Sequence, residues 1–249
     1  MIAQIIGLRK IPLIKHGDNI GDHIVAAARE EGLRLEDHDI IVVAQKIVSK
    51  AEGNVVNLKG VAPSPLAKRI AKMAQKDPRH IETILRETAR IVRMTSGHII
   101  VETQHGFVCA NAGVDRSNVE DEDSVVVLPK DPDLSARKIR ERVLELAGAD
   151  VGVIVSDTFG RAWRVGQVNV AIGVAGFSPI MDYRGSTDMF GYVLSVTQMA
   201  VADELASAAE LVMGKRDGIP VAIIRGVEYP KGAGSAKDLI RPKEDDLFR

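Results

Sequence analysis

The stretch Val151–Gln167, VGVIVSDTFGRAWRVGQ, decides the fold that we expect for this chain. It begins with five apolar residues, Val151–Val155, and a short run rich in β-branched residues is typical of a strand that is covered on both faces. The run ends at Ser156, where a carboxylate, hydroxyls, a glycine and two arginines follow at once. In sheets covered by helices, ligands bind at such strand ends. The sequence therefore predicts the floor of an active site that handles a metal ion and phosphate.

Further apolar runs and helix-capping residues predict an α+β fold, with a mixed, largely antiparallel sheet and flanking helices. The other predicted strands are 3–7, 39–44, 91–94, 98–102, 107–110, 124–128, 168–175 and 220–225. The predicted helices are 18–31 (capped by Asp18), 65–76, 78–88, 133–147 (beginning at Asp133 or Ser135) and 188–213. We expect one catalytic unit over residues 1–249, with two possible lobes. One lobe would combine about 1–88 with 150–249, and the other would be a strand-rich insertion at about 89–149.

Composition excludes several classes of function. The 33 basic and 34 acidic side chains leave a net charge of −1, so there is no bulk positive field for general nucleic-acid binding. A single cysteine, Cys109, excludes an intrachain disulfide and a multi-cysteine zinc site, and suits a reducing cytoplasm. The longest uncharged run, 165–181, contains three glycines and a proline and is a poor membrane span. We therefore expect a cytoplasmic protein that partners neither nucleic acid nor membrane.

Two aspartates and a threonine form a candidate metal site. Asp115 follows a predicted strand, and Asp157 and Thr158 follow another. Carboxylate and hydroxyl oxygens suit Mg²⁺ or Mn²⁺, which keep several waters and accept phosphate oxygens as further ligands. Each aspartate could instead be a turn residue that hydrogen-bonds its own backbone, and for Asp157 the two interpretations are evenly balanced.

Basic side chains could hold the phosphate. Lys46 and Lys50 are four residues apart, so they share one side whether the segment is a helix or a strand, although a solvated basic face is an alternative. Arg161 and Arg164 could clamp a carboxylate or phosphate, or form surface ion pairs. The chain has no G-x-x-x-x-G-K-[ST] motif and no G-x-G-x-x-G after a strand, so we expect neither a P-loop nor a Rossmann fold.

These residues alone predict a metal-dependent enzyme that handles phosphate, and four separated motifs make the interpretation more specific. They are QKIVSKAEG at 45–53, NAGVDRSN at 111–118, SDTFGRAWRVGQVNVAIGVAG at 156–176 and DYRGSTDMFGY at 182–192. Together they closely resemble the coenzyme F420-0:gamma-glutamyl ligase family, over essentially the whole chain. Actinobacterial relatives carry an additional nitroreductase-like domain, so this chain resembles the single-module, archaeal-type form.

The resemblance implies a GTP-dependent ligase that adds L-glutamate, through γ-linked amide bonds, to the deazaflavin precursor coenzyme F420-0. The products would be F420-1 and F420-2 with GDP and phosphate, formed through an acyl phosphate. Members of the family require Mn²⁺ or Mg²⁺, and we expect two such ions at the site. K⁺ increases their activity. Its fold is an α+β arrangement that forms an intertwined homodimer.

The resemblance also assigns roles to individual residues. Asp115 and Asp157 match one metal site and Thr158 matches a second, while Lys46 and Lys50 would act with the aspartates in catalysis. The residues that match nucleotide contacts are Ile11, Pro12, Leu13, Ile14, Gln45, Lys46, Lys50, Asn118, Met213, Gly214, Lys215, Arg216, Asp217, Gly218, Ile219 and Pro220. Relatives often have a metal-binding glutamine where Lys215 stands. A protonated lysine cannot bind a metal, so the second site is either absent here or completed by other groups.

Two other classes of function are compatible with the residues. A metal-dependent nucleotide phosphohydrolase would release phosphate from GTP without an acceptor. A regulatory nucleotide-binding module would bind GTP and form no product, although charged groups at the end of a buried strand count against it.

Overall fold

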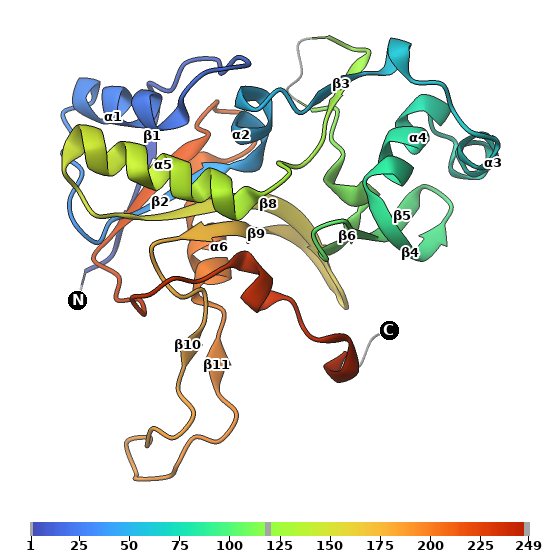
Figure 1. Cartoon of the computed structure of the whole chain (residues 1–249). Helices are drawn as coiled ribbons and strands as arrows, with labels where there is room; N and C mark the ends of the chain where they lie inside the picture. Colours follow the sequence, from blue (N-terminus) through green and yellow to red (C-terminus); the bar gives the residue numbers. More distant parts are fainter. Residues whose placement is uncertain (1, 118–120, 247–249) are drawn as a thin grey trace.

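The computed structural model of the protein describes residues 2–117 and 121–246. Its centre is a five-stranded sheet in the order β1-β12-β2-β8-β9 (Figure 1). The strands are β1 (Gln4–Leu8), β2 (Ile40–Ala44), β8 (Gly152–Arg161), β9 (Arg164–Ala175) and β12 (Val221–Arg225). β2 and β8 pair in parallel, and the other three pairs of this sheet are antiparallel. The predicted α+β class with a mixed, largely antiparallel sheet is therefore confirmed.

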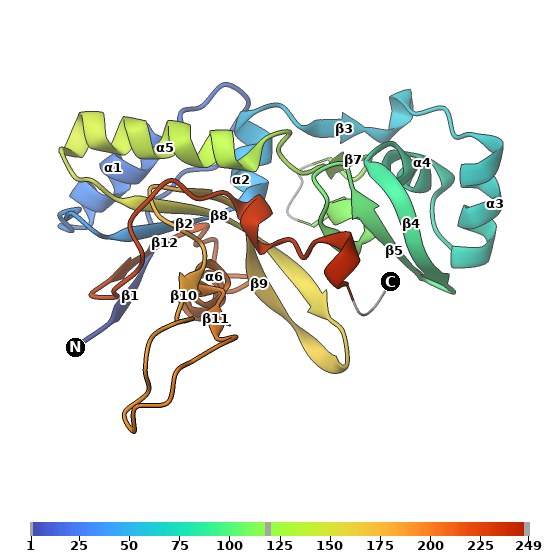
Figure 2. The ribbon, with the colours of Figure 1, turned by 60° about the horizontal axis from the view of Figure 1, so that its bottom comes forward.

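Helices cover both faces of this sheet, which explains the continuous apolar runs in its central strands. α1 (Ile20–Glu30) and α5 (Pro132–Ala147) lie on one face, and α6 (Val201–Met213) lies on the other (Figures 1 and 2). Between them, the first four residues of β2 are completely buried. A strand with helices on both sides has no solvated face, so polar residues need not alternate along it.

A smaller body with its own hydrophobic core lies beside the sheet (Figure 2). Its strands are β3 (Val55–Asn57), which pairs with β7 (Ser124–Val126), and the three-stranded set β4 (Thr88–Thr95), β5 (His98–Thr103) and β6 (Val108–Ala110). Its helices, α3 (Pro65–Ala74) and α4 (Pro78–Arg86), begin at prolines as predicted, each after a side-chain cap. The predicted boundaries between two lobes stay a prediction.

The predicted end of the strand at Ser156 is wrong. The ladder between β2 and β8 does end there, at the pair Ala44–Ser156. β8 nevertheless continues to Arg161, because β9 pairs with it as far as Arg164. Asp157 and the residues that follow therefore lie in a hairpin that projects beyond the rest of the sheet, where β9 satisfies the backbone and leaves polar side chains available.

The predicted helix at 188–213 is also wrong in its first half. α6 begins only at Val201, and residues 178–200 form an extended arm with the short strands β10 (Met181–Asp182) and β11 (Gln198–Met199) (Figure 1). Asp188 does not cap a helix but accepts hydrogen bonds from the backbone N–H groups of Phe190 and Tyr192. Gly191, at φ +86°, completes that turn.

Two helix starts differ slightly from prediction. Asn19, not Asp18, caps α1, and its side chain accepts from the backbone of Gly21 and Asp22. Asp131 caps α5, which places Asp133 inside the first turn. Within the described residues, no helix is both long and apolar enough to cross a lipid bilayer.

Gly173 provides a test of how closely α5 packs on β9. A Cβ at this position would lie 2.3 Å from the carbonyl oxygen of Pro132, which is backbone and cannot move aside as a side chain can. We expect Gly173→Ala to lower the free energy of unfolding by about 1–3 kcal/mol in urea titrations. Gly160→Ala is the control, since a Cβ there meets nothing within 4 Å, and it should change stability by less than about 0.5 kcal/mol. Equal effects of the two changes would contradict this packing.

Candidate active site

Helix α2 (Gln45–Ala51) follows β2 without a loop, which settles the open question about this segment in favour of a helix. Lys46 and Lys50 are one helical turn apart and therefore lie on the same side of α2. Gln45 is buried, and its side-chain oxygen accepts a hydrogen bond from Ser49 at 2.9 Å. The helix thus places two ammonium groups along one line beginning at the end of the β2–β8 ladder.

Asp115 reaches this region from the smaller body. Its backbone pairs with Val126, and its carboxylate accepts a hydrogen bond from Lys46 Nζ at 2.8 Å. Ser117 donates to the same carboxylate from both its backbone N–H and its hydroxyl, each at 2.8 Å. Burial alone would raise the pKa of Asp115, but these hydrogen bonds and the charge of Lys46 hold it below its ordinary value. Asp115 is therefore a carboxylate fixed in its charged form.

Asp157 lies close enough to Asp115 for the two charges to interact. Burial raises the pKa of Asp157 to about 6, and the charge of Asp115 adds to this effect. A hydrogen bond from the Thr158 backbone and the charges of Lys46 and Lys215 oppose it. The structure thus brings together the two predicted aspartates and Lys46 from three separate segments. Two hard-oxygen carboxylates, one of them poorly compensated, are groups that a divalent cation would stabilise.

These two aspartates fit a divalent ion that also binds substrate. Among the described residues, no group of three or more His, Cys, Asp or Glu side chains could hold a metal ion by itself. Asp115 and Asp157 would therefore share the ion with water and phosphate oxygens, as is typical of Mg²⁺ and Mn²⁺ at nucleotide sites.

Thr158 belongs to a different network, because successive side chains of a strand point to opposite faces. Its hydroxyl accepts a hydrogen bond from Lys215 Nζ at 2.7 Å and donates to Asn169 Oδ1 at 2.8 Å. Lys215 also forms an ion pair with Glu210 at 3.1 Å, and Asn169 donates to Glu210 at 2.9 Å. An ammonium group therefore stands where a second metal ion was expected, so the side chains in this arrangement do not fit such an ion.

A cavity of about 510 Å³ opens beside α2. Its walls include Ile14 and Lys50, two of the predicted nucleotide contacts, together with His16 and Gly53. A volume of this size accommodates a ligand as large as a nucleoside. Because Lys46 lies one turn away and contacts Asp115, the cavity and the aspartate pair lie along the same helix.

The other residues predicted to contact the nucleotide are more widely spread than those of α2 and the cavity. Ile11 packs against the main core, Pro12 and Leu13 are exposed, and Asn118 lies outside the described residues. In 213–220, Met213 and Ile219 are buried and Pro220 is half-buried. The exposed loop between the two buried residues (Gly214, Lys215, Arg216, Asp217 and Gly218) carries Lys215 to Thr158.

Arginines at the hairpin tip do not join this cluster in the described structure. Arg161 and Arg164 are both exposed, and Arg161 donates to the carbonyl of Val165. Sequence reasoning missed Ser117, Asn169 and Glu210. Only Ser117 had a visible signal, because a serine two residues after an aspartate is typical of a turn closed by the carboxylate.

The pKa of Asp157 predicts that its charge destabilises the protein when no metal is bound. The folded protein holds this proton up to about pH 6, whereas the unfolded chain releases it near 3.8, so stability from this group is lost as pH rises between those values. At pH 7.5 in EDTA, Asp157→Asn should be more stable than the natural protein by up to about 3 kcal/mol in urea titrations.

The difference should shrink as the pH falls towards 4, and Asp115→Asn should destabilise at pH 7.5 because that carboxylate is paired. Added Mn²⁺ should stabilise the natural protein more than the Asp157→Asn variant. If Asp157→Asn were instead less stable than the natural protein at pH 7.5 in EDTA, the inferred environment of Asp157 would be contradicted.

Comparisons with known proteins agree with the motifs. A profile of the family described as "F420-0:Gamma-glutamyl ligase" matches residues 8–226. The "Coenzyme F420:L-glutamate ligase" of Methanothermobacter thermautotrophicus is 51% identical over 254 residues, which cover 100% of both chains. The ligase of the same name from Methanocaldococcus jannaschii is 47% identical over 99% of this chain and 97% of its own. That from Methanopyrus kandleri is 46% identical over 97% of each chain. The chain therefore belongs to the F420-0:gamma-glutamyl ligase family.

Proposed function

We propose that this protein is a GTP-dependent ligase that joins the amine of L-glutamate to coenzyme F420-0 through a γ-linked amide bond. A second addition would convert F420-1 to F420-2, and each would release GDP and phosphate. The observation that carries the proposal is the meeting of Asp115, Asp157 and Lys46 next to a cavity lined by Lys50. The description of the family and the names of its relatives support F420-0 as the acceptor and L-glutamate as the amino acid that is added.

The chemistry explains why such a site is needed. A carboxylate is a poor electrophile, so the acceptor carboxylate must first be activated. In the proposed reaction it takes the γ-phosphoryl group of GTP, which forms an acyl phosphate and GDP. The glutamate amine then attacks the acyl carbon, and phosphate leaves. Phosphoryl transfer depends mainly on positioning and on offsetting charge.

Each part of the site has a role in this scheme. Lys50 would contact the nucleotide in the cavity, and Lys46 would lie beside the transferring phosphoryl group while it orients Asp115. A Mn²⁺ or Mg²⁺ ion held by Asp115 and Asp157 would supply positive charge to the phosphate oxygens. A second ion at Thr158 would require Lys215 to move, and a role for K⁺ stays a proposal, as does a cytoplasmic location.

We also propose that the protein works as a homodimer through the arm at 178–200, which projects from the body (Figures 1 and 2). The arm exposes large apolar side chains, including 89% of Met189, 77% of Phe190 and 81% of Val196. Clustered apolar side chains on a projecting segment are typical of an interface. An arm that exchanges between two copies would account for an intertwined dimer.

The ligase proposal predicts a specific product. Protein incubated with GTP, Mn²⁺, L-glutamate and F420-0 should form mono- and diglutamyl products detectable by mass spectrometry, with stoichiometric GDP. Asp157→Asn should lower turnover at least ~100-fold because it removes one preorganised charged group. Glu141→Gln, an exposed carboxylate on α5, is the control and should retain full activity.

Other outcomes would identify the alternatives. Release of phosphate from GTP at the same rate without glutamate and F420-0 would indicate a nucleotide phosphohydrolase. Stabilisation by GTP without any product would indicate a regulatory binding module.

The arm makes a separate prediction about assembly. The double change Phe190→Ser with Val196→Ser should shift the protein from dimer to monomer in light scattering after size-exclusion chromatography, because it removes apolar area from the interface. Leu211→Ser is the control, since this side chain is 82% exposed on α6 and not on the arm. A monomeric natural protein, or a dimer unaffected by the double change, would contradict the role of the arm.

A further inference from the structure

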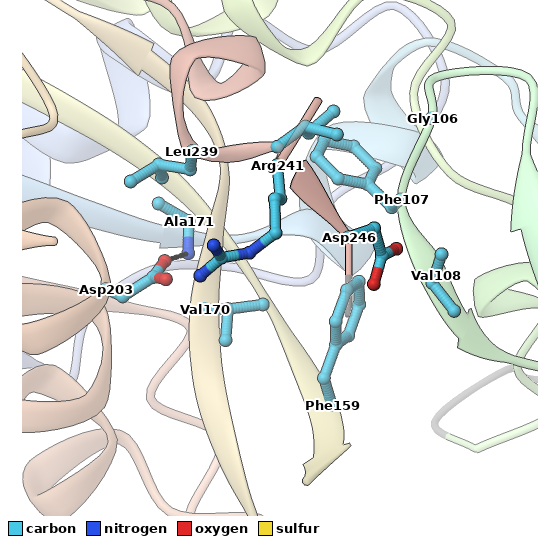
Figure 3. A pocket seen from close by; sticks show the side chains of 11 residues that line it. Gly106, Phe107, Val108, Phe159, Val170, Ala171, Asp203, Leu239, Arg241 and Asp246 are labelled. Carbon is cyan, nitrogen blue, oxygen red and sulfur yellow. Dashed lines mark hydrogen bonds between the residues drawn. The ribbon is translucent and has the colours of Figure 1, made fainter. Parts of the chain in front are cut away.

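A second cavity, of about 300 Å³, is lined in part by the β8–β9 hairpin, and the proposed nucleotide and metal sites leave it without a ligand (Figure 3). Its walls come from the hairpin, from the turn before β6, from α6 and from residues 235–246, which we call the C-terminal strap. Phe107, Phe159, Val170 and Leu239 make most of the surface apolar, and the charged groups are Asp203, Arg241 and Asp246.

This cavity is directly adjacent to Asp157. Asp157 is paired with Val170 across the hairpin, and opposite residues of an antiparallel pair point to the same face. Phe159, two residues further along β8, also points to that face. Two cavity residues are therefore immediate neighbours of the candidate ion-binding carboxylate, so a molecule in the cavity could present a group to the site of phosphoryl transfer.

The aromatic residues provide a surface for a flat ring. Phe107 and Phe159 lie edge to face, with ring centroids 6.3 Å apart, and Phe107 is also stacked on His105. Figure 3 shows the ring of Phe159 along one side of the cavity, opposite Val108. Aromatic side chains held in this way favour offset or edge contacts with planar ligands.

Arg241 supplies the positive charge of the cavity. Its guanidinium points into the space above Val170 (Figure 3), and none of the ion pairs among the described residues involves Arg241. The strap that carries Arg241 is fixed on both sides. Asp133 accepts hydrogen bonds from Ser235 at 2.5 Å and from the Ala236 backbone at 3.0 Å.

On the other side of Arg241, Lys243 forms an ion pair with Glu102 at 3.5 Å. Among the described residues the guanidinium therefore has no ion-pair partner, which is the state expected of an arginine that pairs with an anionic ligand. Asp203 contributes an acceptor near the opposite wall, and its carboxylate is already oriented by a hydrogen bond of 2.8 Å from the Ala171 backbone.

We propose that this cavity binds the acceptor substrate: a planar aromatic heterocycle packs against Phe159, and Arg241 pairs with an anionic group of the same molecule. The inference rests on the proposed function, in which the acceptor is a deazaflavin that must carry a carboxylate. Asp203 can accept a hydrogen bond from a ring N–H. Free L-glutamate is a poorer match, because it has no apolar surface to cover the aromatic wall.

The experiment measures binding separately from turnover. F420-0 alone, without GTP or metal, is titrated with the full chain, and quenching of its fluorescence reports the dissociation constant. We expect Arg241→Gln to weaken binding at least tenfold and Phe159→Ala to weaken it and reduce the quenching. Phe159→Tyr should bind nearly as the natural protein does, and Lys237→Gln, an exposed basic residue on the same strap, should have no effect.

Steady-state kinetics then separate the substrates. Arg241→Gln should raise the KM for F420-0 at least tenfold and leave the KM values for GTP and L-glutamate within about twofold. An increase in the KM for L-glutamate alone, or an unchanged dissociation constant for F420-0 in folded Arg241→Gln and Phe159→Ala variants, would overturn the inference. Absence of any glutamylated product from the natural protein would instead refute the proposed function, whatever the binding titration shows.

Discussion

Strands β8 and β9 remain paired beyond the point where β2 ends. This difference in strand length positions the charged groups of the candidate active site. β2 stops at Ala44 and becomes α2, so β8 loses its parallel neighbour at Ser156. β9 keeps the β8 backbone hydrogen-bonded as far as Arg161. Side chains from Asp157 onward are therefore held by a rigid strand while one of its edges is open. A carboxylate placed there is well oriented without being surrounded by main-chain donors.

The two aspartates differ in a way that suits a shared cation. Asp115 is compensated by Lys46 and Ser117, so its pKa is low and its charge adds to the stability of the fold at neutral pH. Asp157 has no hydrogen-bonded cation among the described side chains, and burial together with Asp115 raises its pKa. The negative charge of Asp115 is therefore compensated within the chain. The charge of Asp157 would be compensated by a bound cation. Such a carboxylate lowers stability in the free protein and increases affinity for a cation.

The pattern of residues predicted the fold class and most strands because buried strands leave a direct signal in composition. Val151–Val155 and β2 are buried on both faces and read as continuous apolar runs. The sequence did not predict that β8 continues through polar residues, because its partner β9 is what keeps that segment extended. The helix predicted from Asp188 failed for a related reason: the segment before α6 contains Gly191 and several β-branched residues, and its apolar side chains belong to a projecting arm. The candidate site residues could be named from motifs, whereas the contact between Lys215 and Thr158 depends on tertiary structure.

The positions of the two cavities are compatible with the proposed chemistry. The cavity lined by Lys50 lies along α2, the cavity lined by Phe159 lies along the hairpin, and Asp157 is next to the point where both elements begin. A nucleotide in the first and an acceptor in the second would therefore approach the same carboxylate pair from two directions. Transfer of a phosphoryl group between them needs the attacking and leaving oxygens roughly in line, so the two molecules must approach the transferred group from different sides. The glutamate amine must also reach the acyl carbon, and the edge of β8 beyond Ser156, where pairing with β2 has ended, is not closed by main-chain hydrogen bonds to that strand.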